Sequence, residues 1–318
     1  MKEIGGYIEL DTYHLPMPHE EAIALNCGRN CLAYLFRSKG IKKLKVPYFL
    51  CSSVFDVCDR EGIEKTYYHI GLDFKPSCEL KLEDGEWLYL VNFYGQLGNE
   101  EIRKYVERFG RVIVDQAHAF FERPLPGVDT LYTCRKWFGV ADGAFLYTDK
   151  LLSEPLPRDE SNGRMNFLLG RYERTAAEFY DAYKANNAFF AAEPVKEMSK
   201  LTRNLLHAID YDAVRRRREE NFAFLDEQFR SFNMLRLRNA GFMYPLMIKN
   251  GASVRKKLQT EGIYIPLLWP SVLEVTAPPD REREMAEDIL PLPVDQRYGL
   301  AEMKYMTKKI KELQELVR

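Results

Sequence analysis

An aspartate and a lysine each follow a strand-like segment, in a pattern that suits amine chemistry. The apolar run 112–114 leads directly into Asp115, and after a loop the segment 131–133 leads towards Lys136. A lysine amine can form a Schiff base with an aldehyde, and a buried carboxylate can keep a pyridinium nitrogen protonated. Pyridoxal phosphate (PLP) chemistry requires these two groups, so Lys136 and Asp115 are the candidate catalytic residues.

Both residues also have a plainer interpretation. A lysine that follows a strand is most often a solvated surface residue. An aspartate at the same kind of position is often the N-cap of a helix. Residue type and position leave these alternatives open.

A glycine before a predicted helix offers a place for a phosphate group. Gly28, Arg29 and Asn30 come directly before a helical pattern over residues 31–38. The start of a helix presents free backbone N–H groups and the positive end of the helix dipole, and a glycine allows close approach. A glycine here is also a common helix cap, so this motif is weak by itself.

Several motifs, taken in chain order, resemble one family. The segments DQAHAF and TLYTCRKWFGVADG are similar to the core of the fold-type I PLP-dependent aminotransferases, and most similar to the DegT/DnrJ/EryC1/StrS (sugar aminotransferase) family. The likeness continues over much of the chain in LNCGRNCLAYLF (25–36), KVPYFLCSSV (45–54), NFYGQLG (92–98), GIYIPLLWP (262–270) and LPVDQRYG (292–299).

The resemblance implies a PLP-dependent aminotransferase. An amino acid donor such as glutamate would load the amino group, and a keto acceptor, by analogy a nucleotide-linked keto-sugar, would receive it. The coenzyme would be held by Lys136 as an internal aldimine, with Asp115 at its ring nitrogen. The resemblance also implies a homodimer with shared active sites.

The same resemblance assigns cofactor contacts to further residues. The turn Gly28-Arg29-Asn30 would lie under the phosphate, where the hydroxyl of Thr133 is a second candidate. His118 would lie near the ring hydroxyl or on the cofactor, although a core histidine is the alternative. Cys51 takes the place where relatives commonly have an aromatic ring, so Tyr48 or His118 would have to supply that face.

Substrate contacts are predicted at three positions. Tyr94 follows the apolar run 87–93, and loops at strand ends line the ligand crevice of such sheets. Trp269 and Arg297 fall in the part of the chain that closes over the site in relatives. Arg297 could bind a carboxylate with two hydrogen bonds, but Asp295 is near enough to form a structural ion pair instead.

Two other functions remain open. The lysine and the acid would serve a PLP-dependent lyase, racemase or decarboxylase equally well. A non-catalytic ligand-binding protein that retains the fold is also compatible with Cys51 and with a chain shorter than many relatives.

The elements that position these residues alternate between strand and helix. Strand-like segments lie at 44–46, 65–70 and 87–93. A helical pattern at 52–61 separates the first two, and another at 100–109 follows the third. This alternation predicts a mostly parallel, doubly wound α/β sheet. Long helices are predicted over 164–187 and 195–231, the second broken near 210–212.

Two domains are expected. The large PLP-binding domain with its trailing helices would cover residues 1–231, and a smaller C-terminal α+β domain would cover 232–318. Residues 1–20 are expected to form an extended arm. The small domain is predicted to hold strands at 241–248, 263–265 and 289–290 and helices at 254–261 and 300–316.

Composition excludes several other classes of protein. The 318 residues are 46% hydrophobic and 29% charged with a net charge of −1, which does not suggest a nucleic-acid binder. No apolar run is long enough to span a membrane, and the N-terminus has no apolar signal core. Cys27 and Cys31 lack a second pair or a nearby histidine, so no metal site is expected. We expect a cytoplasmic protein with reduced cysteines.

Overall fold

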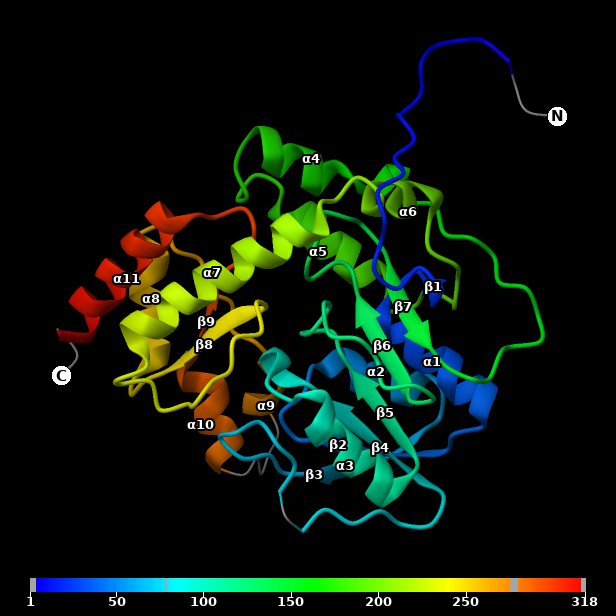
Figure 1. The fold of residues 1–318 in the computed structure, drawn as a ribbon, viewed down its shortest axis with the longest axis horizontal. Helices are drawn as coiled ribbons and strands as arrows, with labels where there is room; N and C mark the ends of the chain where they lie inside the picture. Colours follow the sequence, from blue (N-terminus) through cyan, green and yellow to red (C-terminus); the bar gives the residue numbers. More distant parts are fainter. Residues whose placement is uncertain (1–3, 78, 275–279, 316–318) are drawn as a thin grey trace.

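A seven-stranded sheet forms the centre of the computed structural model, which describes residues 4–77, 79–274 and 280–315 (Figure 1). The strand order is β1-β7-β6-β5-β4-β2-β3. The strands are β1 (Ile23–Leu25), β2 (Lys43–Pro47), β3 (Glu64–Tyr68), β4 (Glu86–Val91), β5 (Val112–Asp115), β6 (Asp129–Thr133) and β7 (Ala144–Tyr147).

The sheet is mostly parallel, which confirms the predicted fold class. Strands β3, β2, β4, β5 and β6 run parallel to one another, whereas β7 is antiparallel to both β6 and β1. Asp115 pairs with Val91 on one side and Leu131 on the other. The carboxyl ends of three central strands therefore meet at one edge of the sheet, where open α/β sheets bind ligands.

Helices cover both faces of this sheet. Helices α1 (Gly28–Lys39) and α2 (Ser52–Arg60) contact each other behind the sheet, and α3 (Asn99–Phe109) lies in front of it in Figure 1. Helix α1 buries a continuous set of residues from Asn30 to Phe36. It ends at Gly40, whose φ of 66° is the left-handed conformation that glycine adopts readily.

The two long helices predicted after the sheet are four shorter ones. They are α4 (Asn166–Glu173), α5 (Tyr180–Phe189), α6 (Lys200–Leu206) and α7 (Tyr211–Phe229), with the 3₁₀ turn η2 (Asn162–Arg164) before them. The breaks have local causes. Arg174 leaves helical geometry, and the side chains of Ser199 and Asp210 cap α6 and α7. The predicted break near 210–212 is therefore confirmed, whereas the continuous helices are wrong.

A second, smaller group of elements surrounds the two-stranded antiparallel sheet of β8 (Met243–Met247) and β9 (Ile289–Pro293). Its helices are α8 (Gly251–Thr260), α9 (Ser271–Glu274), α10 (Asp280–Asp288) and α11 (Leu300–Glu315). The predicted strand at 263–265 is wrong, because this segment is a loop between Gly262 and Pro266 with no strand partner. The predicted end of the last helix, residue 316, lies outside the described residues.

A separate hydrophobic core supports this smaller group. It includes Phe222, Leu225 and Phe229 from the second half of α7 together with residues of β8, β9 and α11. In contrast, Trp269 and Val272 pack into the core of the large sheet. A domain boundary at residues 231/232 stays a prediction.

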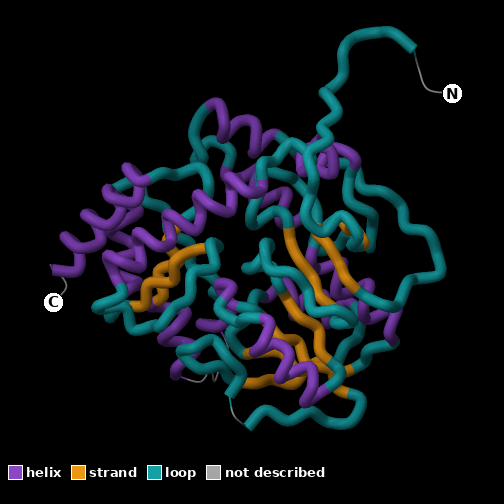
Figure 2. Tube along the Cα trace, in the orientation of Figure 1, coloured by secondary structure: helices purple, strands orange, loops and turns teal. Residues whose placement is uncertain are grey.

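The N-terminal arm runs along the surface and then extends away from the body of the protein, as Figure 2 shows. Its inner part is anchored on α6, where the backbone N–H of Tyr13 donates to Asn204 Oδ1 at 2.9 Å. Within the described residues no helix is long and apolar enough to cross a membrane. Five of the six cysteines have free thiols, and Cys78 lies outside the described residues.

Candidate cofactor site

Asp115 is buried at the carboxyl end of β5, where two donors hold its carboxylate. The hydroxyl of Tyr89, on the neighbouring strand β4, donates to Oδ2 at 2.6 Å. The backbone N–H of Ala117 donates to Oδ1 at 2.8 Å. A carboxylate can accept about four hydrogen bonds, so Asp115 keeps acceptor capacity for a further cation or N–H group.

Lys136 lies in the loop after β6, and its side chain is exposed. Its Nζ atom is 3.0 Å from Nε2 of His118. The next residue, Trp137, donates from Nε1 to the carbonyl oxygen of Ala117 at 2.9 Å. This bond joins the loop that carries Lys136 to the loop that begins at Asp115, so the structure brings the two predicted catalytic segments together.

His118 lies at the centre of an aromatic cluster. Its ring stacks on Phe242, with centroids 4.0 Å apart and planes at 17°, and its Nδ1 accepts the backbone N–H of Tyr94 at 3.2 Å. Burial, and secondly the charge of Lys136, lowers the pKa of His118 well below its ordinary value. His118 is therefore buried like a core histidine and lies beside Lys136, and its contact with a cofactor stays a prediction.

Two of the predicted substrate residues adjoin His118. Trp269, from the loop after α8, lies 5.7 Å from the His118 ring and 5.8 Å from Tyr94. Tyr94 and Trp269 both have positive φ angles, 52° and 58°. Such conformations are costly for residues other than glycine and occur often at functional sites. Both side chains are buried here, so contact with a substrate stays a prediction.

The third predicted substrate residue, Arg297, is engaged elsewhere. Its Nε and Nη2 atoms form an ion pair with the Asp295 carboxylate, at 2.6 and 2.9 Å. The sequence left a structural ion pair open as the alternative, and the structure contains that pair.

The predicted phosphate turn forms the first turn of α1. A side chain at Gly28 would meet no atom within 4 Å, so the space over this turn is open. The Asn30 side chain is occupied by bonds to Asn26 and to the carbonyl oxygens of Glu193 and Pro194. Among the described buried groups, Asn26 Nδ2 lacks a hydrogen-bond partner. The backbone N–H of Asn30 donates to the Cys27 carbonyl at 3.1 Å, so the candidate donors at the turn are the N–H groups of Gly28 and Arg29 and the Asn26 amide.

Two arginines reach from the turn and from the Lys136 loop to one residue of α5. Arg29 donates to the carbonyl oxygen of Asn187 at 3.2 Å, and Arg135 donates to the side-chain oxygen of the same asparagine. The Arg135 guanidinium lies over the Phe190 ring, 4.7 Å from its centroid. Burial lowers the pKa of Arg135 from its ordinary value.

The remaining predicted cofactor contacts lie at the ends of strands and helices. Thr133 is the half-buried last residue of β6, and Cys51 is the N-cap of α2. The thiol of Cys51 accepts a hydrogen bond from Ser53 Oγ at 3.1 Å. Tyr48 stacks on Tyr67 and His69, and the aromatic face that the sequence offered from Tyr48 stays a prediction.

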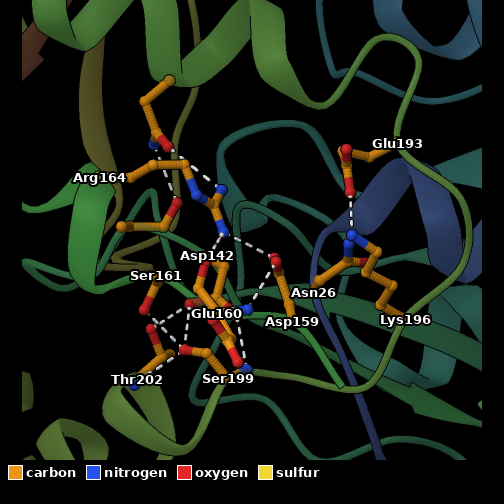
Figure 3. Close-up of polar contacts among 12 residues, drawn as sticks. Asn26, Asp142, Asp159, Glu160, Ser161, Arg164, Glu193, Lys196, Ser199 and Thr202 are labelled. Carbon is orange, nitrogen blue, oxygen red and sulfur yellow. Dashed lines mark hydrogen bonds and ion pairs between the residues drawn. The ribbon is translucent and has the colours of Figure 1, made fainter. Parts of the chain in front are cut away.

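A buried polar network braces the loop behind Lys136 (Figure 3). The carboxylate of Asp142 accepts the backbone N–H of Ser199 at 2.8 Å, its hydroxyl at 2.7 Å, and the hydroxyl of Thr202. Ser199 and Ser161 share a further bond of 2.7 Å. Next to Asp142, the Gly143 N–H donates to the Asn26 carbonyl. The network thus ties the Lys136 loop to α6 and to the phosphate turn.

The cavities described in the structure lie elsewhere. One of about 470 Å³ is lined by residues of β1, the 151–158 loop and α6, and another of about 640 Å³ by the N-terminal arm and α6. Asp115, His118 and Lys136 line neither of them. No group of three or more histidine, cysteine, aspartate or glutamate side chains within the described ranges could hold a metal ion.

Sequence reasoning missed several residues at the site. Tyr89 carried a signal, because a tyrosine inside a buried strand needs a partner for its hydroxyl. Phe242 and Asn187 carried none, since their contacts depend on the tertiary fold. Arg218 carried none either, although it is buried and donates to the carbonyl oxygen of Trp137 at 3.1 Å.

Comparison with known proteins identifies the fold. No protein-family model and no curated protein matches the sequence. A DegT DnrJ EryC1 StrS aminotransferase from Brucella abortus is 15% identical with a TM-score of 0.62, over 92% of this chain and 85% of that one.

Two further solved structures agree. The sugar aminotransferase CalS13 from Micromonospora echinospora is 16% identical with a TM-score of 0.63, over 93% of this chain and 88% of that one. A putative sugar aminotransferase from Streptococcus pneumoniae, solved in its PLP form, is 12% identical with a TM-score of 0.66, over 94% of this chain and 89% of that one. The chain therefore has the fold of the DegT/DnrJ/EryC1/StrS aminotransferases, as its motifs predict.

Proposed function

We propose that this protein is a PLP-dependent aminotransferase. The observation that carries the proposal is the hydrogen bond from Trp137 to Ala117, which joins the loop of Lys136 to the loop of Asp115. A primary amine and a buried carboxylate are thereby brought to one edge of a mostly parallel sheet, beside a helix N-terminus. This is the set of groups that the coenzyme requires.

The residues present fit the coenzyme. Asp115 keeps free acceptor capacity beside its two donors, which suits a ring N–H. Gly28 leaves open space over the first turn of α1, and the unpartnered Asn26 amide lies in the same segment. Backbone N–H groups of this turn would hold the phosphate, with Arg29 close by and Thr133 as a further hydroxyl. His118 and Cys51 would border the ring.

The chain's own groups have separate roles in the proposed reaction. When bound, the coenzyme supplies an electron sink for the bond that breaks at the α-carbon of the amino acid. Lys136 would be the covalent anchor, and its amine, once freed, would take the proton from the α-carbon of the amino acid. Asp115 would keep the ring nitrogen protonated, which needs an anion at that position. Tyr94 and Trp269 would close the space around the substrate.

The substrates follow by analogy with the structural neighbours. CalS13 is a sugar aminotransferase, so we propose, by analogy, an amino acid donor and a keto-sugar acceptor that is linked to a nucleotide.

A homodimer would complete the site. Helix α4 buries no residue against its own chain, yet it carries two large hydrophobic residues, Leu169 and Tyr172, which are 61% and 93% exposed. Helix α5 adds exposed Tyr180 and Tyr183 and holds Asn187, which binds both arginines near the phosphate turn. A second subunit on α4 and α5 would cover these aromatic side chains and enclose the exposed Lys136.

The amino-donor half-reaction tests the proposal. Protein loaded with PLP would be mixed with single amino acids, and conversion of the bound coenzyme to its amine form would be followed by absorbance. We expect conversion with at least one donor and no conversion in Lys136→Ala, with Lys150→Ala as the control for an exposed lysine. Release of carbon dioxide or ammonia in place of amine transfer would contradict the proposal and indicate a decarboxylase or lyase.

A further inference from the structure

The two arginines near the first turn of α1 carry more positive charge than the described acidic side chains neutralise there. We propose that Arg135 binds the phosphate group of the coenzyme, with Arg29 beside it, and that Asn187 holds the Arg135 guanidinium at this turn. The inference deepens the proposed function and rests on it for the identity of the ligand as PLP.

Most of the hydrogen-bonding capacity of Arg135 is unused. A guanidinium group has five N–H donors. Within the described part of the chain, Arg135 makes one hydrogen bond, from Nη2 to Asn187 Oδ1, and it lies 4.7 Å from the centroid of the Phe190 ring. An amide oxygen and a ring face do not neutralise a full charge. Arg135 can therefore offer several donors to an anion without breaking an ion pair.

The neighbours of Arg135 are cationic instead of acidic. Arg164 lies over the same ring at 5.0 Å, and Arg29 donates to the Asn187 carbonyl at 3.2 Å. Arg164 has an acid of its own, Asp159, at 2.7 Å. No ion pair joins Arg29 or Arg135 to an acidic side chain of the described residues. Burial, and further the charges of Arg29 and Arg164, lowers the pKa of Arg135, but an arginine remains charged at neutral pH.

Both unpaired charges act at the N-terminus of α1. Burial raises the pKa of the thiol of Cys27, the N-cap of this helix, and the charges of Arg29 and Arg135 lower it in smaller part. Such an effect requires that both guanidinium groups lie near the thiol. The N–H groups of Gly28 and Arg29 and the positive end of the helix dipole are at the same place. Three sources of positive potential therefore meet at one turn.

A buried amide without a partner marks this turn as a ligand site. Asn26 is fully buried, and its Oδ1 accepts from Asn30 Nδ2 at 2.9 Å, which holds the side chain against the first turn of α1. Its Nδ2 lacks a hydrogen-bond partner among the described residues, and a buried donor in that state is costly. The space over Gly28 is open to 4 Å. A phosphate group there would supply the acceptor oxygens that the amide and Arg135 lack.

Adjacent residues would then hold adjacent groups of the coenzyme. The aldehyde and the phosphate arm of PLP are attached to neighbouring carbons of its ring. Lys136 turns to His118 and Arg135 turns to Asn187, so the two side chains of this dipeptide point to different partners. Lys136 would bind the aldehyde and Arg135 the phosphate. The planar fork of an arginine suits this task because it can bind two phosphate oxygens at once.

The affinities for PLP and for pyridoxal, which lacks the phosphate, test the assignment. Absorbance titration of the coenzyme-free protein at neutral pH gives both Kd values. In Arg135→Gln we expect the preference for PLP over pyridoxal to fall about 10- to 100-fold. An effect of Arg135 on the adjacent Lys136 would alter both affinities alike and cancel in the ratio. Arg216→Gln, on the exposed face of α7, is the control and should keep the parent's preference. An unchanged preference in Arg135→Gln would overturn the proposal.

Asn187→Asp tests the same site in a protein that keeps Arg135. An aspartate at this position would form an ion pair with Arg135 and compete with the phosphate. The preference for PLP should therefore fall, while the urea midpoint stays equal to that of the parent or rises. A preference equal to the parent's in this variant would also contradict a phosphate contact of Arg135.

Inorganic phosphate separates the anion site from the proposed function. Added to the coenzyme-free parent, it should raise the thermal midpoint more than chloride at the same ionic strength, and this gain should be lost in Arg135→Gln. No gain in the parent, or an equal gain in both proteins, would overturn the proposal. A parent that gains stability from phosphate through Arg135 but does not bind PLP would contradict the proposed function and support the anion site.

Discussion

At the scale of single residues, the site depends on hydrogen bonds that orient a few ionisable groups. Residue type and spacing singled out Asp115 and Lys136, and the resemblance to the family added His118. Their mutual contacts could not be predicted, because the donors that hold them are Tyr89 and the backbone of Ala117 and Tyr94. Backbone donors leave no trace in a sequence, since every residue except proline has one.

Asp115→Asn should retain the fold and lose most of the activity. The amide oxygen can accept from the Ala117 N–H while the amide N–H donates to the Tyr89 hydroxyl, so unfolding by urea should change little. A neutral amide cannot stabilise a protonated ring nitrogen, and loss of such an electrostatic contact costs about 10²- to 10³-fold in kcat. The matched control is Tyr89→Phe, which keeps the charge and should lose much less. Turnover of Asp115→Asn near that of the parent would exclude the proposed role.

Acid should destabilise the protein through its buried histidines. Burial lowers the folded-state pKa of His118 and of His19 below the ordinary value of 6.5. The unfolded chain binds a proton at each as pH falls below about 6.5, and the folded protein does not. The stability is therefore present above that pH and is lost below it, by up to about 1.4 kcal/mol per pH unit for each group.

Urea unfolding at pH 7.5, 6.5 and 5.5 measures this effect. His118→Gln removes one titrating group, so its stability should fall less steeply with acid than that of the parent. His14→Gln, in the exposed N-terminal arm, is the control and should follow the parent. An unchanged slope in His118→Gln would show that His118 is not held neutral in the folded protein.

At the scale of elements, the strands were predicted better than the helices. A run of buried apolar residues specifies a central strand, and β2, β4 and β5 form where the sequence predicts them, within one or two residues. The helices after β7 could not be placed as well. Their ends are set by the caps Ser199 and Asp210 and by the change of direction at Arg174. The short edge strand β1 has no pattern of its own and depends on pairing with β7.

Arg218 connects elements that the sequence left unconnected. From α7 it donates to the Gly241 carbonyl at 3.0 Å, to Gln296 at 2.7 Å and to the Trp137 carbonyl at 3.1 Å. Its guanidinium lies 4.4 Å from the centroid of the Trp137 ring. Burial lowers its pKa to about 10, so it still carries its charge at neutral pH. One side chain thus holds the Lys136 loop against the start of β8.

Arg218→Ala should destabilise the protein by about 3–5 kcal/mol. The change removes the Arg218 donor from the buried Gly241 carbonyl and the packing against Trp137, although the Trp137 carbonyl keeps the bond from Gln296 Nε2 at 2.9 Å. The adjacent Arg217 is largely exposed, with one long ion pair of 3.9 Å to Glu220, so Arg217→Ala should change stability by less than about 0.5 kcal/mol. Equal urea midpoints for the two variants would contradict the role given to Arg218.

At the scale of the whole molecule, the site lies where the large sheet meets the smaller group of elements, since β8 contacts the turn η1 (Phe93–Gly95) that follows β4. Trp269 and Phe242 come from the C-terminal part of the chain and contact His118 of the large sheet. The sequence placed all these segments in the family's order. It could not show that Arg297 would pair with Asp295 and so be engaged within its own loop.

The exposed face of α4 and α5 predicts a homodimer. Leu169→Asp combined with Tyr172→Asp should reduce the molar mass in solution from a dimer to a monomer, because charges would be buried at the interface. Tyr305→Asp, on the exposed face of α11, is the control and should remain dimeric. Light scattering over a range of protein concentrations measures the molar mass of each variant. A parent protein that is monomeric at all concentrations would contradict the shared site.

The central claim is that the coenzyme is attached to Lys136, and one measurement tests it directly. The protein is incubated with PLP, the linkage is reduced with borohydride, and the added mass is located by peptide mass spectrometry. We expect a single major adduct on Lys136, and none on that peptide in Lys136→Ala. An adduct mainly on another lysine, or no adduct at saturating PLP, would contradict the account.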